Sequence, residues 1–412
     1  MAATRLSYLA IKRETTVASA VTPNKFIRFK DGDISYNQEI IANNPIQNNR
    51  WNAINAVPWK INTEWSYNVD LEANECVHFL SAALWEQASV DISSGADSTV
   101  YKHTLSLANS LPSVTIEQGK GNISDTGNNR QNYQVDRAYG VLIDSFTLAG
   151  SDAIINMEVA LKAHWIFQKS NIISDVAAGS NADLELESVE GLTISDTVNI
   201  YDSTPQSESD AIIAIDAVAK TIEIATLWNS YTVANTAKVE LLPLTPSYPL
   251  APKVLSFIHC SFQFWDDLTA AATSAQENIE NWEFSYENNL EERYGSLRSS
   301  PSVIAPKGAK ATLKFSKYFE NVKDRDRYLN LTKQAWILTI SNNEIVSDTD
   351  SNQAKYTIKI KMSDLRFTTY EMPTWTDELY ATSIEAECFY DWSDAHAVQI
   401  EITNAKAGTE YS

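Results

Sequence analysis

The stretch Pro58–Gln87 reads PWKINTEWSYNVDL followed by EANECVHFLSAALWEQ, which is a proline, a strand-like run and an amphipathic helix. A second copy of this order begins at Pro306, where PKGAKATLKFSKYF is followed by ENVKDRDRYLNLTKQA. In both copies the glutamate that begins the predicted helix lies 14 positions after the proline. One order of elements used twice at matching spacing predicts an internal duplication.

The similarity between the two copies continues upstream of each proline. ISYNQ at 34–38 precedes the first proline, and FSYEN at 284–288 precedes the second. Tyr36 lies 22 residues before Pro58, and Tyr286 lies 20 residues before Pro306. A long polar loop separates tyrosine from proline in both copies, and loops of this length are usually functional. We therefore expect the loops to be contact arms.

The composition is that of a folded chain with several domains. At 412 residues it is long enough for two or three domains, each with its own core. No apolar run approaches the roughly 18 residues that cross a bilayer. Arg5, Lys12 and Arg13 interrupt the N-terminal apolar residues, so a signal peptide is not predicted. The three cysteines lack a CxxC spacing and are expected to be reduced thiols, as in a protein made and folded in a cytoplasm.

The charge balance is strongly acidic, with 32 basic and 53 acidic residues and a net charge of −21. Affinity for nucleic acid comes chiefly from Lys and Arg, so tight binding of phosphates is not expected. Glycine is scarce at 12 residues, where average use predicts roughly 29. Several of the 11 tryptophans, among them Trp265, Trp375 and Trp392, occupy stretches where a turn would favour glycine. Either these turns use other geometries, or the aromatic residues serve interfaces.

We divide the chain into four parts. Residues 1–25 lack periodicity and are predicted to be an N-terminal arm, whereas 26–167 and 245–412 hold the two copies. In the first copy, Asp31-Gly32 is predicted to be a hairpin turn. Between the copies, 168–244 has short alternating strands and is predicted to be an inserted small all-β domain. The acidic character is marked here, since residues 166–244 contain three lysines and twelve acidic residues.

The predicted fold class is mainly β (α+β): two β-sandwich or β-barrel domains with one helix each, plus the inserted domain. In the first helix, predicted over 72–87, an apolar stripe is expected to face the core. The second helix is far more charged, and mixed signs indicate either a solvated salt-bridged surface or a subunit contact. The charged residues in question are Lys323, Arg325, Arg327 and Lys333.

Motifs for catalysis are absent from the sequence. It contains no phosphate-binding loop, no nucleophile elbow and no HExxH. Cys76 with His78, and His259 with Cys260, are spaced so that each pair's side chains point to different sides of a helix or strand. No acidic cluster has the EF-hand spacing. We expect no enzyme, no metal and no cofactor, although a site made of scattered carboxylates stays an alternative.

The duplicated proline-strand-helix order, the long polar arms and the closing strand AVQIEITN at 397–404 resemble the major tail tube proteins of long-tailed bacteriophages. The similarity covers most of residues 25–405, and the inserted stretch resembles small β-modules of phage tail proteins. Many tube proteins carry a single domain, so this chain departs from the usual length. The resemblance implies stacked rings whose inner strands close a β-barrel lumen. A duplicated member is expected to form homotrimers that are pseudo-hexameric rings.

The resemblance also implies location in the virion tail and DNA ejection through the lumen without specific binding of DNA. The implied partners are further copies of the chain, a tape measure protein, and tail terminator or baseplate proteins, with no membrane. The arms at 37–58 and 287–306 are the expected ring-stacking contacts. The candidate residues are Asn44, Asn48, Asn49, Arg50, Trp51, Glu291, Arg293 and Arg298. The alternative is a β-rich carbohydrate-binding or adhesin module, in which exposed tryptophans stack on sugars.

Overall fold

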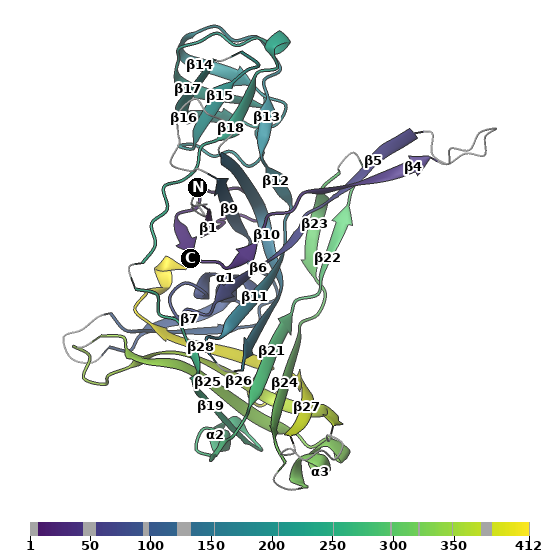
Figure 1. Cartoon of the computed structure of the whole chain (residues 1–412), viewed down its shortest axis with the longest axis vertical. Helices are drawn as coiled ribbons and strands as arrows, with labels where there is room; N and C mark the ends of the chain where they lie inside the picture. The colour runs from purple at the N-terminus through teal and green to yellow at the C-terminus, as the bar shows by residue number, and fades with distance from the viewer. Residues whose placement is uncertain are drawn as a thin grey trace, which may run out of the picture.

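The structure is a computed structural model of the chain, and the mainly-β class predicted from the sequence is confirmed. It describes residues 7–43, 55–93, 99–121, 133–151, 153–204, 206–249, 251–296, 299–319, 322–347, 349–371 and 381–411. Figure 1 shows a tall molecule with a small sheet domain at one end and α2 and α3 at the other. The helices of the described residues are α1 (Val77–Ala83), α2 (Leu268–Ala271) and α3 (Lys323–Leu329), with 3-10 turns at Val233–Asn235 and Gly408–Glu410.

A sheet of eight antiparallel strands runs through the described part of both sequence copies. Its spatial order is β3–β6–β11–β10–β21–β24–β27–β26, so the two copies meet where β10 pairs with β21. We call it the main sheet. Its strands are β3 (Asp31–Gly32), β6 (Glu64–Asp70), β11 (Asn156–Lys162), β10 (Tyr133–Gly150), β21 (Asn281–Glu287), β24 (Lys310–Tyr318), β27 (Ala381–Phe389) and β26 (Lys355–Glu371).

The long strands β10 and β26 each belong to two layers. Only their second halves lie in the main sheet, where pairing begins at Leu142 in β10 and at Asp364 in β26, and a bulge follows at Asp144 and at Thr368. Such bulges bend a strand and increase its twist. The first half of β10 pairs with β9 (Val114–Gly121) and β12 (Trp165–Phe167), beyond which lie β1 (Tyr8–Arg13) and β2 (Lys25–Ile27). The first half of β26 pairs with β25 (Gln334–Ile345) on one side and with β28 (Val398–Asn404) on the other. Beyond β25 lie β19 (Ser256–Trp265) and then β20 (Gln276–Glu277). Beyond β28 lie β8 (Tyr101–Ser106) and then β7 (Glu86–Asp91).

Two hairpins extend from the main sheet. The first consists of β4 (Asn37–Asn43) and β5 (Asn55–Asn62), and the second of β22 (Leu290–Tyr294) and β23 (Pro301–Pro306). They lie side by side in Figure 1, and the Ile61 amide donates a hydrogen bond of 2.8 Å to the Ser299 carbonyl. The hairpins occupy the places of the two predicted arms.

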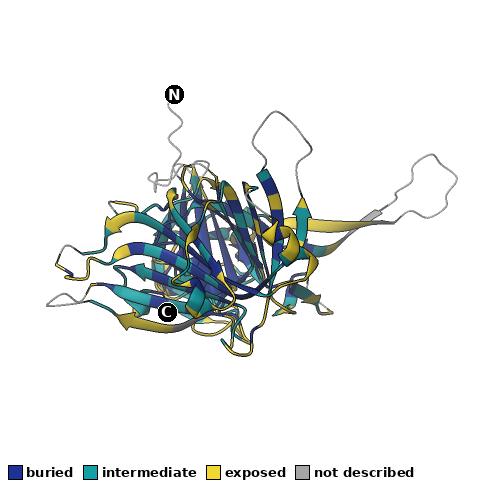
Figure 2. Cartoon of the chain, turned by 90° about the horizontal axis from the view of Figure 1, so that it is seen from below, coloured by how far each residue is buried: buried dark blue, intermediate teal, exposed yellow. Residues whose placement is uncertain are grey.

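One hydrophobic core lies between the layers and spans both copies. In α1, Val77, Phe79 and Leu80 are fully buried, as the predicted apolar stripe requires. In the second copy, Trp336 stacks on Phe264 with ring centroids 4.9 Å apart. Figure 2 shows the buried residues in the middle of the body and the exposed residues on its outside and along the projecting strands. The core therefore joins the copies into one body.

Residues 169–241 form a separate sheet, whose hydrophobic cluster also includes Val135 of β10 and Phe167 of β12. This sheet lies inside the range 168–244, which the sequence predicts to be a small β domain, and we call it the insert. Its order is β13–β18–β15–β16–β17–β14. The strands are β13 (Lys169–Asn171), β14 (Gly179–Glu185), β15 (Thr197–Tyr201), β16 (Ser207–Asp216), β17 (Thr221–Leu227) and β18 (Lys238–Leu241).

Three local predictions are wrong. The predicted helix at 72–87 is shorter, because Glu72 forms an isolated β-bridge with Val254, residues 73–76 form turns, and 86–91 belong to β7, which pairs with β8. Asp31-Gly32 is not a turn but pairs with β6. Only glycine suits position 32, because its φ is 119° and a Cβ there would lie 2.4 Å from the Ser66 carbonyl oxygen. Tyr8–Arg13, predicted to belong to an arm, is the strand β1, and its Leu9 and Ile11 are buried in the core.

Glu75, just before α1, provides a test of buried charge. Burial, together with Glu72 and against the effect of Arg28, raises the pKa of Glu75 to about 7. The folded state therefore holds this proton more tightly than the unfolded chain, so stability rises as the pH falls from about 7 toward the unfolded value of about 4.3. We expect Glu75→Gln to raise the free energy of unfolding by on the order of 2 kcal/mol at pH 8 and to change it little at pH 5. Urea unfolding at both pH values measures this, and an equal effect at the two values would contradict it.

Candidate functional site

The main sheet repeats one arrangement of four strands. β3–β6–β11–β10 in the first copy corresponds to β21–β24–β27–β26 in the second, in the same order and with antiparallel pairing throughout. In each copy the hairpin lies between the first and second of these strands in sequence. The helix follows the second strand in each copy, as α1 follows β6 and α3 follows β24. The duplication seen in the sequence is thus matched by the topology.

The strand registers give the equivalence residue by residue. Pro58 pairs with Ile40 in the first hairpin, and Pro306 pairs with Leu290 in the second. The tyrosines also match, since Tyr36 precedes Ile40 by the same interval that separates Tyr286 from Leu290.

The equivalence extends to the third and fourth strands of each repeat. Trp65 lies opposite Leu161, and its equivalent Leu313 lies opposite Ala386. Aligning the bulges then makes Thr369, Tyr370 and Glu371 equivalent to the three consecutive residues Ser145, Phe146 and Thr147.

One face of the main sheet is polar along its whole width, while the other face packs into the core. The side chains of this face, all polar except Ala149 and Ala160, are half-buried or exposed. They are Glu64, Ser66, Asn68 and Asp70 on β6, Asn156, Glu158, Ala160 and Lys162 on β11, Ser145, Thr147 and Ala149 on β10, Asn281, Glu283, Ser285 and Glu287 on β21, Lys310, Thr312, Lys314 and Ser316 on β24, Ser383, Glu385 and Glu387 on β27, and Thr369 and Glu371 on β26.

The charges on this polar face are mostly negative, and the three lysines just named all have a glutamate partner. Lys162 lies 3.0 Å from Glu64, Lys314 lies 3.7 Å from Glu283, and Lys310 lies 3.9 Å from Glu387. Each pair joins neighbouring strands and is partly exposed, so its contribution to stability is small. The pairing also weakens any attraction of these lysines for a phosphate group, because each ammonium already faces a carboxylate.

The junction between the copies is a complete strand interface. Tyr286 of β21 lies opposite Phe146 of β10, and their rings stack with centroids 5.4 Å apart. On the polar face, Thr147 lies opposite Ser285, and their hydroxyl oxygens are 3.1 Å apart. Asn288 closes the junction, because its side-chain amide donates to the Ile143 carbonyl at 2.9 Å. Continuous pairing therefore joins the two repeats.

The two outer ends of the main sheet have no such partner among the described residues. At one end, residues 33–36 connect β3 to β4 without strand pairing. At the other end, the segment of β26 after Leu365 pairs with β27 on one side only. Strand edges of this kind are templates for pairing with another chain. These two edges are the candidate functional site.

Side-chain exposure at the first edge differs sharply from that at the junction. Tyr36 is 41% exposed, whereas its equivalent Tyr286 is 2% exposed. Ile40 is 66% exposed, whereas its equivalent Leu290 is 6% exposed and packs against Leu142. Both apolar side chains are buried at the junction by the neighbouring repeat. The same two positions are therefore covered in the second repeat and uncovered in the first.

The predicted ring-stacking residues fall mainly outside the described residues, namely Asn44, Asn48, Asn49, Arg50, Trp51 and Arg298. Glu291 and Arg293 lie on β22, where the Glu291 carboxylate is 3.1 Å from the Lys307 ammonium and 3.8 Å from the Arg293 guanidinium. A role of these residues in stacking stays a prediction.

The charged residues predicted around the second helix have acidic neighbours in their own chain. Arg327 binds Asp324 at 2.9 Å, and its guanidinium lies 4.4 Å from the centre of the Phe264 ring. Lys333, just beyond α3, pairs with Asp391, and Arg325 lies 3.4 Å from Asp326. A salt-bridged surface thus describes these three residues. A subunit contact that uses them or Lys323 stays a prediction.

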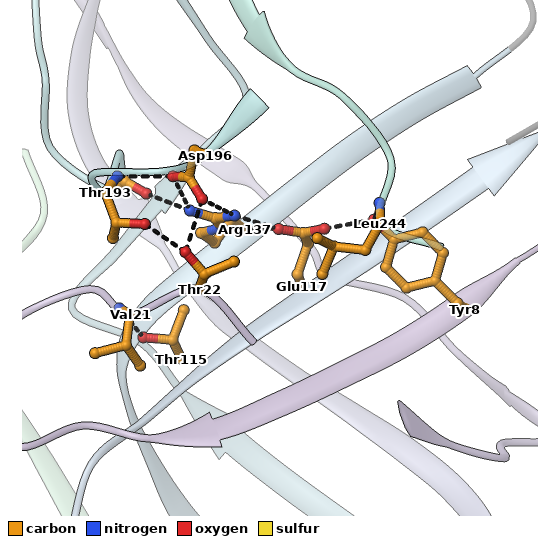
Figure 3. A network of polar contacts seen from close by, with 10 residues as sticks. Tyr8, Val21, Thr22, Thr115, Glu117, Arg137, Thr193, Asp196 and Leu244 are labelled. Carbon is orange, nitrogen blue, oxygen red and sulfur yellow. Dashed lines mark hydrogen bonds and ion pairs between the residues drawn. The ribbon is translucent and has the colours of Figure 1, made fainter. Parts of the chain in front are cut away.

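A buried ion network ties the insert to the body (Figure 3). Arg137 of β10 donates to Glu117 of β9 at 2.8 Å and to both carboxylate oxygens of Asp196 in the insert, at 2.5 and 3.0 Å. All three side chains are buried. Burial by itself lowers the pKa of Arg137, but the two carboxylates outweigh it and raise the pKa. Burial raises the pKa of Glu117, and Arg137 opposes this only in part.

The ends of the network hold the chain on both sides of the insert. The Thr22 hydroxyl donates to the Asp196 carboxylate at 2.9 Å, and this bond connects the N-terminal segment to the network. Tyr8 donates to Glu117, and the Leu244 amide at the exit of the insert donates to the Tyr8 hydroxyl oxygen at 2.9 Å. The orientation of the insert is therefore fixed by directional bonds in a dry environment. Sequence reasoning missed this network, although an arginine in the apolar run VDRAYGVLI was a signal.

Other kinds of site were sought in the same residues. Within the described ranges, no three His, Cys, Asp or Glu side chains converge to hold a metal ion. Burial raises the pKa of the Cys76 thiol and lowers that of His78 to about 3, so neither is charged near neutral pH. No helix in the described part of the chain is both long and apolar enough to cross a membrane. No model of a known protein family matches the sequence, and no curated protein is significantly similar to it.

Proposed function

We propose that this protein is a structural component of a virion, the tube protein of a long-tailed bacteriophage, and that its stacked rings form a conduit for DNA. The observation that carries the proposal is the main sheet, which is polar and mostly acidic on one face, repeated within the chain and open at both ends. Closing such a sheet into a barrel removes its edges. The polar face then lines the lumen.

The geometry of a closed barrel favours several copies per ring. Barrels of 16–18 strands leave an aqueous channel, and wider barrels need more strands. A ring of three copies with eight strands each would have about 24 strands, enough for a channel wider than that of a porin. Each ring would be a homotrimer with pseudo-sixfold symmetry, because each copy contributes two equivalent repeats.

The polar face supports the conduit more than a binding role. A protein that holds DNA neutralises phosphates with Lys and Arg, and its affinity falls steeply with salt. Here lysines of this face are paired with glutamates, as for Lys162 with Glu64. DNA would pass along this face without being gripped. Stacking of rings is an open, head-to-tail contact that generates a filament, and the proteins at its two ends would be the tape measure and the terminator or baseplate proteins.

Electron microscopy of negatively stained protein at rising concentration tests the proposal. We expect rings with a central channel, and tubes at the higher concentrations. A monodisperse monomer at every concentration, or dimers without a channel, would refute it. Electrophoretic mobility of linear DNA is the second readout, and we expect no shift at 150 mM salt.

A carbohydrate-binding module has less support from the structure. Trp228, Trp265 and Trp392 are more than half exposed, as sugar stacking requires. Trp228 follows β17 in the insert, however, whereas Trp265 ends β19 beside α2 at the opposite end of the molecule (Figure 1). These two side chains cannot share one sugar chain of ordinary length. Binding of a glycan array by a monomer would favour this alternative.

A further inference from the structure

We propose that the two free edges of the main sheet bind each other between copies of this chain, in a register that the internal junction specifies. Residues 35–37 of one copy pair antiparallel with Thr369–Glu371 of β26 in the next copy. Tyr36 then lies opposite Tyr370, as Tyr286 lies opposite Phe146. The main sheet continues from chain to chain without a break.

The register follows directly from the equivalence of the two repeats. Within the chain, β10 pairs with β21 so that Ser145, Phe146 and Thr147 lie opposite Glu287, Tyr286 and Ser285. In the second repeat, the equivalents of the three β10 residues are Thr369, Tyr370 and Glu371. In the first repeat, the equivalents of the three β21 residues are Asn37, Tyr36 and Ser35. The pairs between copies are therefore 369 with 37, 370 with 36, and 371 with 35.

The chemistry of these pairs fits a half-buried strand interface. Tyr36 with Tyr370 is an aromatic pair on the core side, and such cross-strand pairs are favourable. Glu371 opposite Ser35 and Thr369 opposite Asn37 are polar pairs on the other side, without like charges. Ile40 adds an apolar contact, because its equivalent Leu290 packs against Leu142 of the neighbouring repeat. A second copy of the chain is thus the occupant that the exposed residues fit.

This inference deepens the proposed function and rests on it for the choice of a second copy as partner. It goes beyond that function because it names the edges, the direction and the register. The contact is head-to-tail, since one edge belongs to the first repeat and the other to the second. Heterologous contacts of this kind close into a ring when the rotation per copy permits it.

Disulfide cross-linking between polar-face positions tests the register. Directly paired residues of antiparallel strands have Cα atoms about 4.5–5.5 Å apart, which a disulfide can span. We expect the double variant Ser35→Cys, Glu371→Cys to give covalent dimers and larger closed species under mild oxidation. Mixing the two single variants should give only a dimer, which shows that the bond joins different copies.

The chain supplies matched controls. The variant Thr147→Cys, Ser285→Cys places the same pair at the internal junction and should form a disulfide without a change in mass on a gel. The variant Asn37→Cys, Glu371→Cys is shifted by two residues and should cross-link at least about tenfold less, because diagonal neighbours are about 7–8 Å apart. The unmodified chain, with its own cysteines, measures the background.

The outcomes separate this inference from the proposed function. Suppose that rings are seen in the microscope but that cysteines at 35 and 371 form no disulfide, or form less of it than cysteines at 37 and 371. This result would overturn the proposed register but not the proposed tube function. Cross-linked chains that never form rings would support the proposed interface between copies and refute the proposed tube function. A double variant that stays monomeric on the gel and in the microscope would overturn both.

Discussion

Replacing Arg137 by methionine is expected to lower the free energy of unfolding by about 3–5 kcal/mol, because it leaves two buried carboxylates without their common cation. Glu117 and Asp196 are at most 3% exposed, so water cannot replace the guanidinium. Methionine keeps most of the volume and removes the charge. Urea unfolding at pH 7 measures the change, and limited proteolysis of the linkers around 168 and 242 should accelerate as the insert loosens.

Two further variants separate buried charge from lost packing. Adding Glu117→Gln and Asp196→Asn to Arg137→Met should recover part of the loss, because neutral amides cost less to bury than carboxylates. Lys253→Met is the matched surface control, since its partner Glu344 is 52% exposed, and the expected change is below about 1 kcal/mol. A single variant as stable as the unmodified protein, or a triple variant less stable than the single one, would contradict this account.

The repeated architecture could be predicted from the sequence because its signals are local. A proline, an alternating strand and a helix recur at fixed spacing, and the strand register places Pro58 and Pro306 at equivalent positions. Tyr36 and Tyr286 were also aligned correctly by their surrounding letters. Alternation of apolar and polar residues likewise predicted half-buried strands such as β11, where Met157, Val159 and Leu161 face the core.

The joining of the copies could not be predicted in the same way. The pairing of β10 with β21 connects residues more than 130 positions apart, and nothing in either strand specifies the other. β1 was missed for a related reason. Its apolar run is short and ends in Lys12 and Arg13, and its strand character depends on β9, about 100 residues away. The Arg13 guanidinium lies over the ring of Trp85, 4.3 Å from the ring centre, in a cation–π contact.

The candidate site lies at the sheet edges, whereas sequence reasoning chose residues in the arms, whose role in stacking stays a prediction. The arms drew attention because they are long, and six of the residues chosen there lie outside the described part of the chain. The edges of the main sheet carry no motif, since one is the connection between β3 and β4 and the other is the end of β26. The comparison of Tyr36 with Tyr286 reveals the difference in exposure. A repeat whose equivalent surfaces are buried once and exposed once carries information about its partner that a single domain lacks.

The substitution Tyr36→Asp is expected to weaken assembly by about two to three orders of magnitude. It removes the burial of an aromatic ring, worth about 1.5–3 kcal/mol, and adds a carboxylate that must be desolvated opposite Tyr370. Each 1.4 kcal/mol changes an association constant about tenfold. The concentration at which rings or tubes appear, measured by sedimentation and microscopy, should rise accordingly. Tyr36→Phe keeps the ring and should assemble like the unmodified protein.

The equivalent substitution Tyr286→Asp makes this a paired experiment. Tyr286 is buried within one chain, so Tyr286→Asp should lower the free energy of unfolding by about 3–5 kcal/mol. Tyr36 is 41% exposed in the single chain, so Tyr36→Asp should leave the thermal midpoint of the monomer nearly unchanged. One chemical change at two equivalent positions thus acts on folding in one case and on assembly in the other. If both variants unfold early, or if Tyr36→Asp assembles at the normal concentration, Tyr36 does not lie at an interface between copies.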